Sequence, residues 1–169
     1  MKRPIQALVS ALVFMLCLST SFSTQAVERD SSAVQAIQAY YSEIYRSDST
    51  TSSLDKPERI YAEPLLQLIL QEQKKQATSG ELGQLSADPL CSCQDPSAVE
   101  VRNIRSMPSR KKIQRIQVEL NVSGHTEFIT LQVVKLFRIW KVRDVSTQDI
   151  PSLKQSLLAG QNAQVNQTP

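Results

Sequence analysis

The sequence predicts an α+β fold in which N-terminal helices pack on a curved antiparallel sheet, after an N-terminal export signal. Apolar residues recur every three or four positions between residues 30 and 80, which is the period of helices. From residue 99 onward they alternate with polar residues, which is the period of half-buried strands. Helices first and strands afterwards are typical of the α+β class. A length of 169 residues with 41% hydrophobic side chains fits one domain with one core.

The first 26 residues have the three-part pattern of a secretory signal peptide. Lys2 and Arg3 form a basic start, residues 7–18 are apolar except for Ser10, and small residues lead up to Ala26. We therefore expect cleavage after Ala26 and a periplasmic or secreted protein. The apolar stretch is shorter than the roughly 20 residues that a membrane-spanning helix needs, so a retained anchor is the less favoured alternative.

This pattern divides the chain into a signal peptide (1–26), a single α+β domain (27–160) and a flexible tail (161–169). Cys17 is expected to leave with the signal. The residue before it, Leu16, is larger than a lipoprotein signal peptidase prefers.

The first helix is predicted from a cap at Asp30–Ser32 to about Arg46, with an apolar stripe that includes Ile37 and Tyr41. A Ser/Thr-rich loop follows. Pro57 and Pro64 suit the first turns of two further helices, the second ending at Ser79–Gly80. Residues 77–98 are expected to form a long irregular connection with a helical turn near 81–85.

Four strands follow this connection. They are predicted over residues 99–105, 115–122, 129–133 and 140–145, with a hairpin turn at Ser123–Thr126 and a reversal at Leu136–Arg138. The only Trp, Trp140, is expected to anchor the core on the last strand. Residues 152–159 are predicted to form a terminal helix.

Charge is unevenly spread along the expected mature chain. Residues 27–98 carry 6 basic and 11 acidic groups, and residues 99–169 carry 11 basic and 5 acidic groups. The two halves are either layers of one domain that attract each other, or the basic half meets an anionic partner or lipid surface. The basic residues of the last strands (Lys135, Arg138, Lys141 and Arg143) form either a solvated outer face or a docking patch. A formal charge of +3 for the whole chain argues against a nucleic-acid binder.

Two motifs resemble a family of bacterial exported proteins of unknown function. They are Asp88-Pro89-Leu90-Cys91-x-Cys93-Gln94-Asp95 and Trp140-x-Val142-x-x-Val145. The resemblance covers residues 33–147. It implies the α+β cone of the nuclear-transport-factor-like, or cystatin-like, superfamily, which includes ketosteroid isomerases and many non-catalytic binding proteins, so fold alone does not give the chemistry.

Cys91 and Cys93 are expected to form a disulfide in an oxidising compartment. Buried thiols, a redox-active pair, metal ligands and an intermolecular bridge are the alternatives. Redox enzymes of the thioredoxin type use Cys-x-x-Cys, which is absent, and one His in the whole chain makes a zinc site weak, so no metal and no cofactor are expected.

The ligand-binding candidates are Asp88, Asp95, Tyr41 and Tyr45. The two aspartates adjoin prolines and are ordinary turn residues in one interpretation, and a cation-binding or acid–base pair in the other. The tyrosines, with Tyr40 and Tyr61, either seal the core or line the mouth of a pocket. His125, in the predicted turn, is expected to be exposed and without a role.

The first functional hypothesis is a non-catalytic exported protein that binds a small ligand or another envelope protein. The second is a small periplasmic enzyme using Asp88 or Asp95 with a tyrosine in an acidic pocket. The third is a toxin-neutralising protein that docks through a basic surface. No catalytic residue is assigned, since Gly-x-Ser-x-Gly, His-Glu-x-x-His and Gly-rich phosphate loops are absent, and no membrane-spanning segment is expected after signal cleavage.

Overall fold

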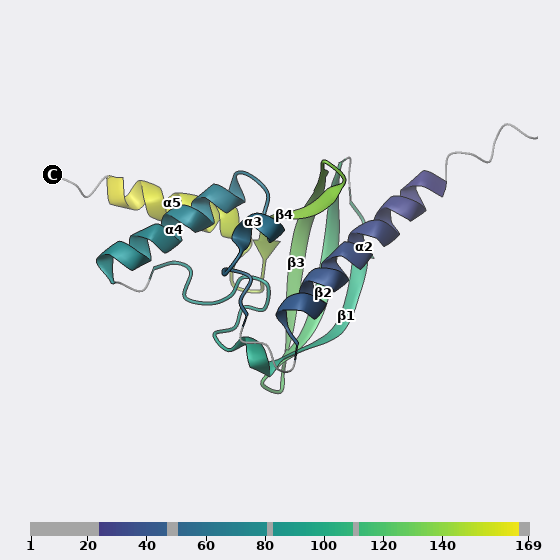
Figure 1. Cartoon of the computed structure of the whole chain (residues 1–169), viewed down its shortest axis with the longest axis horizontal. Coiled ribbons are helices and arrows are strands. Elements are labelled where there is room, and N and C mark those ends of the chain that lie inside the picture. Colours follow the sequence, from purple (N-terminus) through teal and green to yellow (C-terminus); the bar gives the residue numbers. More distant parts are fainter. Residues whose placement is uncertain (1–23, 47–50, 81–82, 110–111, 166–169) are drawn as a thin grey trace, which may run out of the picture.

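A computed structural model describes residues 24–46, 51–80, 83–109 and 112–165 of the chain. In chain order the elements are α2 (Thr24–Ile44), α3 (Pro57–Ile60), α4 (Leu65–Ser79), the 3-10 turn η1 (Pro96–Ala98), β1 (Val99–Met107), β2 (Ile113–Val122), β3 (His125–Leu136), β4 (Ile139–Ser146) and α5 (Leu153–Val165). Helices and an antiparallel sheet in one fold confirm the predicted α+β class (Figure 1).

The sheet is a meander in which each strand pairs with the next in the order β1-β2-β3-β4. The alternation read from the sequence produces its buried face. Ile116 pairs with Leu131 and Val118 with Ile129, and all four side chains are fully buried. The β2–β3 turn consists of Ser123 and Gly124, both with positive φ, as two-residue hairpin turns require. His125 is exposed, as expected, and is the first residue of β3.

Helix α2 crosses the sheet diagonally, whereas α4 and α5 lie side by side beyond β4 (Figure 1). Helix α2 contacts β1, β2 and β4, and α5 contacts both α4 and β4. One continuous core joins both helical groups to the sheet. It includes Ile37 and Tyr41 of α2, Leu65 and Ile69 of α4, Leu157 of α5, and Trp140 and Val142 of β4.

The predicted start of the first helix is wrong. Helix α2 begins at Thr24, so Ser31 and Ser32 lie inside it and do not cap it. Residues 24–30 contain neither Gly nor Pro, and nothing in them stops a helix, because a capping residue favours a helix start but does not impose one. The predicted cleavage site after Ala26 therefore falls within α2, and residues 1–23 lie outside the described part.

The other helix boundaries follow local signals more closely. Pro57 opens α3 and Pro64 precedes α4, which ends at Gly80 with a φ of 70°. Helix α5 continues to Val165, past the predicted start of a flexible tail at residue 161. Residues 166–169, and 81–82 of the predicted helical turn, lie outside the described part.

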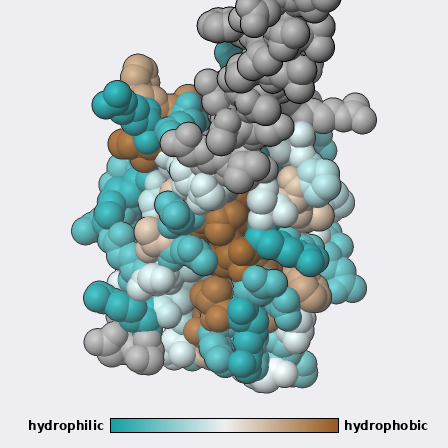
Figure 2. All heavy atoms as spheres, turned by 90° about the vertical axis from the view of Figure 1, so that its right-hand side faces the viewer, coloured by the Kyte–Doolittle hydropathy of each residue, from teal (hydrophilic) through white to brown (hydrophobic). Residues whose placement is uncertain are grey.

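The face on the β1 side is largely hydrophilic, with one narrow strip of apolar atoms down its centre (Figure 2). None of the described helices is long and apolar enough to span a membrane.

Candidate functional site

Three tyrosines and Asp88 meet in the interior between α2, α3 and the long connection. Tyr41 and Tyr61 are 1% exposed, and Tyr45 and Asp88 are also buried. The rings of Tyr41 and Tyr45, one helical turn apart, lie 5.4 Å from each other at 42°. Two sequence-predicted ligand residues, Tyr41 and Tyr45, are thus brought together with Asp88, but inside the core.

Asp88 accepts four hydrogen bonds, two on each carboxylate oxygen. The Ser53 hydroxyl and the Leu90 backbone N–H donate to Oδ1. The Ser52 hydroxyl (2.9 Å) and the Ser53 backbone N–H (2.7 Å) donate to Oδ2. A buried carboxylate needs such partners to offset its desolvation. With its acceptor sites occupied, Asp88 holds the loop around residue 53 against the loop around residue 90.

The tyrosine hydroxyls extend this network. Tyr41 donates to the carbonyl of Leu90 (2.6 Å), and Tyr61 lies 2.7 Å from the Ser53 hydroxyl. The Tyr45 hydroxyl faces Asp88 but has no hydrogen bond of ordinary geometry within the described part of the chain. Burial, and then the negative charge of Asp88, raise the pKa of all three tyrosines well above its usual value.

A disulfide joins Cys91 to Cys93, with sulfurs 1.97 Å apart and Cα atoms 5.1 Å apart. The chain bends at Ser92, whose φ is 55°. The backbone of Asp88 closes the same loop, because its N–H donates to the Cys93 carbonyl and its carbonyl accepts from Ser92. Both cysteines are buried, so the bridge belongs to the interior scaffold.

Asp95 is not part of this cluster. Its carboxylate caps η1 by accepting hydrogen bonds from the hydroxyl (2.6 Å) and backbone N–H (2.9 Å) of Ser97. These bonds lower the pKa of the exposed Asp95 carboxyl. The structure therefore separates the two aspartates that the motif places seven residues apart.

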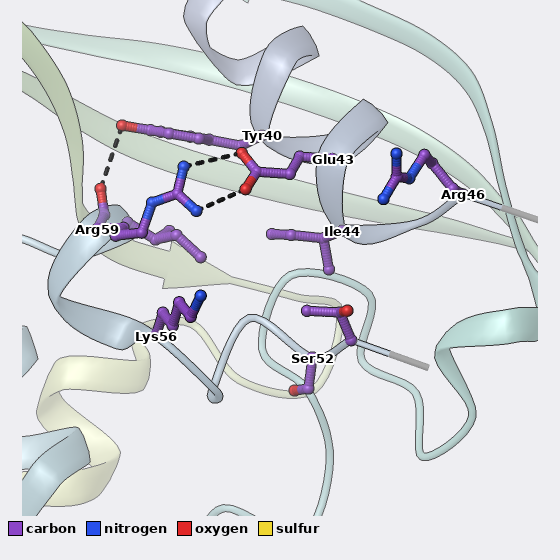
Figure 3. A pocket seen from close by; sticks show the side chains of 9 residues that line it. Tyr40, Glu43, Ile44, Arg46, Ser52, Lys56 and Arg59 are labelled. Carbon is purple, nitrogen blue, oxygen red and sulfur yellow. Dashed lines mark hydrogen bonds and ion pairs between the residues drawn. The ribbon is translucent and has the colours of Figure 1, made fainter. Parts of the chain in front are cut away.

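An open cavity lies elsewhere, at the C-terminal end of α2, and has a volume of about 160 Å³. We call it the α2–α3 groove. It is lined by Tyr40, Glu43, Ile44 and Arg46 at the end of α2, by Thr51, Ser52 and Lys56, and by Arg59 and Ile60 of α3. Figure 3 shows Lys56 reaching from the start of α3 toward Ile44, with Arg46 at the opposite end.

The groove carries excess positive charge. Arg59 forms a bidentate ion pair with Glu43, at 2.5 and 3.0 Å, which raises the pKa of Arg59 and cancels its charge. Within the described part of the chain, Arg46 and Lys56 form no ion pair. Two cations therefore remain in the groove.

Neighbouring contacts fix the shape of the groove. The Tyr40 hydroxyl lies 2.6 Å from the carbonyl of Trp140 and 3.3 Å from that of Arg59. Lys141, one of the predicted outer-face cations, points to α3, where its ammonium donates to the carbonyls of Glu58 and Arg59. Partial burial lowers the pKa of Lys141. These bonds tie α2 and α3 to β4.

A second cavity, of about 80 Å³, adjoins the Asp88 loop. Pro89, Ser92 and Leu153 are among its lining residues. Ligand sites are typically several hundred Å³, so this space is small even for a compact metabolite. Within the described residues, no three His, Cys, Asp or Glu side chains gather as a metal site would require.

The ligand residues predicted from the sequence do not include Arg46, Lys56 or Arg59. A usable signal was present: Arg46 and Lys56 flank the Ser/Thr-rich loop that links two predicted helices. Basic residues on both sides of such a loop line the same groove when the loop turns the chain back on itself.

No protein-family model, curated protein or solved structure matches this chain.

Proposed function

We propose that this is an exported, non-catalytic binding protein whose α2–α3 groove receives an anionic group. The group is a carboxylate or phosphate, carried by a small molecule or by an acidic side chain of another envelope protein. The observation that carries the proposal is that Arg46 and Lys56 line this groove and form no ion pair with another described residue.

The small volume of the groove favours a small ligand. A volume of about 160 Å³ lies below the range of about 300–1,000 Å³ usual for ligand pockets. It suits one charged group with a short apolar stem. Ile44, Ile60 and the ring of Tyr40 supply apolar wall for that stem.

The positions of the cations favour recognition through charge. Lysine and arginine are the usual partners of carboxylates and phosphates, and arginine can bind them with two parallel hydrogen bonds. Because Arg59 is ion-paired with Glu43, it forms part of the groove wall but adds no net charge to the groove. The attraction in such an open groove is screened by salt.

The saturated hydrogen bonding of Asp88 supports a binding protein over an enzyme. A general base needs a free lone pair within reach of the proton that it removes. Asp88 already accepts four hydrogen bonds and is 5% exposed. The exported location and the cone form of the fold, which the signal pattern and the resemblance predict, belong to the same proposal.

Calorimetric titration with inorganic phosphate, succinate and a glutamate-rich peptide tests the proposal. We expect at least one of these probes to bind, and Lys56→Gln or Arg46→Gln to weaken that binding about two- to fivefold, as loss of a partly screened charge pair implies. Lys74→Gln, on the exposed side of α4, is the matched control and should change nothing.

Preference among the probes separates the two sources of the anionic group. Tighter binding of phosphate or succinate indicates a small molecule, and tighter binding of the peptide indicates a protein partner. Equal affinities for wild type and Lys56→Gln, or no binding of any probe, would overturn the proposal.

A further inference from the structure

The turn between β3 and β4 presents apolar side chains to solvent. Leu136 is 41% exposed, Ile139 is 54% exposed and Phe137 is 101% exposed. Together with Arg138 they form what we call the β3–β4 tip. Large apolar side chains that gather on a surface mark sites of interaction with a protein or a membrane.

The backbone of the tip is unfavourable for the residues that it carries. Phe137 and Arg138 have φ values of 47° and 73°. Two-residue hairpin turns of this kind favour Asn-Gly, because side chains with a Cβ are strained in the left-handed region. Neither side chain contributes to the core. Packing within the fold therefore does not account for their presence here.

The charge at this end of the sheet is basic. Arg138 and Lys112 are exposed, and the Lys135 Nζ lies 5.6 Å from the ring centre of Trp140. Residues 101–118 and 128–143, which supply the strands and turns of this end, contain no Asp or Glu. Apolar side chains with cations beside them are the pattern of segments that lie in the interface of an anionic membrane.

The orientation of the fold brings the tip to the end of the sheet at which α2 begins. In an antiparallel meander the β1–β2 and β3–β4 turns share one end, the upper end in Figure 1. The Trp140 indole donates to Ser32, which places the first half of α2 beside the start of β4. The first half of α2 and the tip therefore lie toward the same end of the sheet.

We infer that the β3–β4 tip docks on an anionic lipid surface. Phe137, Leu136 and Ile139 enter the boundary between headgroups and acyl chains, while Lys135, Arg138 and Lys112 face the anionic headgroups. Because the cations are exposed, the contact is weakened by salt.

Site-specific labelling of the full chain tests this inference without depending on cleavage. In a Cys17→Ser background with the disulfide intact, an environment-sensitive fluorophore is attached at Phe137→Cys. The control label is at Thr126→Cys, an exposed position at the opposite end of the sheet. We expect vesicles rich in phosphatidylglycerol to shift the emission of the Phe137 label to the blue, and phosphatidylcholine vesicles to shift it much less. The Thr126 label should respond to neither.

A charge variant completes the test. Lys135→Gln with Arg138→Gln should lower the affinity for the anionic vesicles about tenfold or more. Equal responses of the two labels, or of the two lipids, would contradict the inference. A blue shift of the Phe137 label that depends on protein concentration and not on lipid would show that the tip joins copies of this chain, and would also overturn it.

Discussion

Removing the charge of Asp88 is expected to destabilise the protein although Asp88→Asn changes almost no volume. The backbone N–H groups of Ser53 and Leu90 donate to different oxygens of Asp88, and a backbone N–H cannot reverse its role. An asparagine keeps one acceptor oxygen, so one of these buried donors loses its partner. The two serine hydroxyls can rotate, and their cost is smaller.

An orphaned buried donor costs about 1–3 kcal/mol, and a hydrogen bond to a charged acceptor contributes about 1.5–3 kcal/mol. We therefore expect Asp88→Asn to lower the free energy of unfolding by about 2–3 kcal/mol. Asp88→Ala, which orphans both backbone donors, should cost more. Urea unfolding at neutral pH, followed by the fluorescence of the only Trp, measures the difference.

Asp95→Asn is the matched control. Asparagine caps helical turns about as well as aspartate, and Asp95 is exposed, so the change should stay within about 0.5 kcal/mol. Equal small losses for Asp88→Asn and Asp95→Asn would show that the four hydrogen bonds of Asp88 do not hold the two loops together. The structural role that we assign to Asp88 would then be wrong.

Three further predictions concern the core. Trp140→Ala should cost about 3–5 kcal/mol in the same unfolding assay, because a buried ring and its hydrogen bond to α2 are lost; a loss below about 1 kcal/mol would contradict its anchoring role. At alkaline pH the raised pKa of the buried tyrosines means that the folded state binds more protons than the unfolded state. The contribution of these tyrosines to the free energy of unfolding is therefore fully present below the ordinary tyrosine pKa of 10.0 and is lost as pH rises above it. The absorbance of ionised tyrosine, followed as pH rises, should show that Tyr41, Tyr45 and Tyr61 ionise only when the protein unfolds. Any reversible ionisation before unfolding should come from Tyr40 and should be absent in Tyr40→Phe. Ionisation of more than one tyrosine in folded protein would refute this. Thiol titration should find no free thiol at Cys91 and Cys93, and their double Ser variant should lose little stability because the closed loop is so short. Two reactive thiols in non-reduced protein would contradict the bridge.

Features with a local cause could be predicted from the sequence. The strands follow from alternation at positions such as Ile116 and Val118, and the ends of α4 follow from Pro64 and Gly80. The disulfide and the bend at Ser92 follow from two cysteines separated by one residue in an expected oxidising compartment.

Features that depend on distant contacts could not be predicted. Ser52 and Ser53 lie about 35 residues from Asp88, and nothing in either segment identifies the other as its partner. The candidate tyrosines and Asp88 are indeed neighbours, but their burial inside a saturated network is a tertiary property. The α2–α3 groove likewise exists only where the end of α2 meets α3, which no single segment encodes.

Chemical-shift mapping on isotopically labelled protein tests the central claim, anion binding in the α2–α3 groove, most directly. As succinate or phosphate is added, we expect amide shifts to concentrate in Glu43–Arg46 and Thr51–Ile60, and to diminish in Lys56→Gln. Shifts that concentrate on the basic strands around Lys135 and Arg143, or that persist unchanged in Lys56→Gln, would contradict the account.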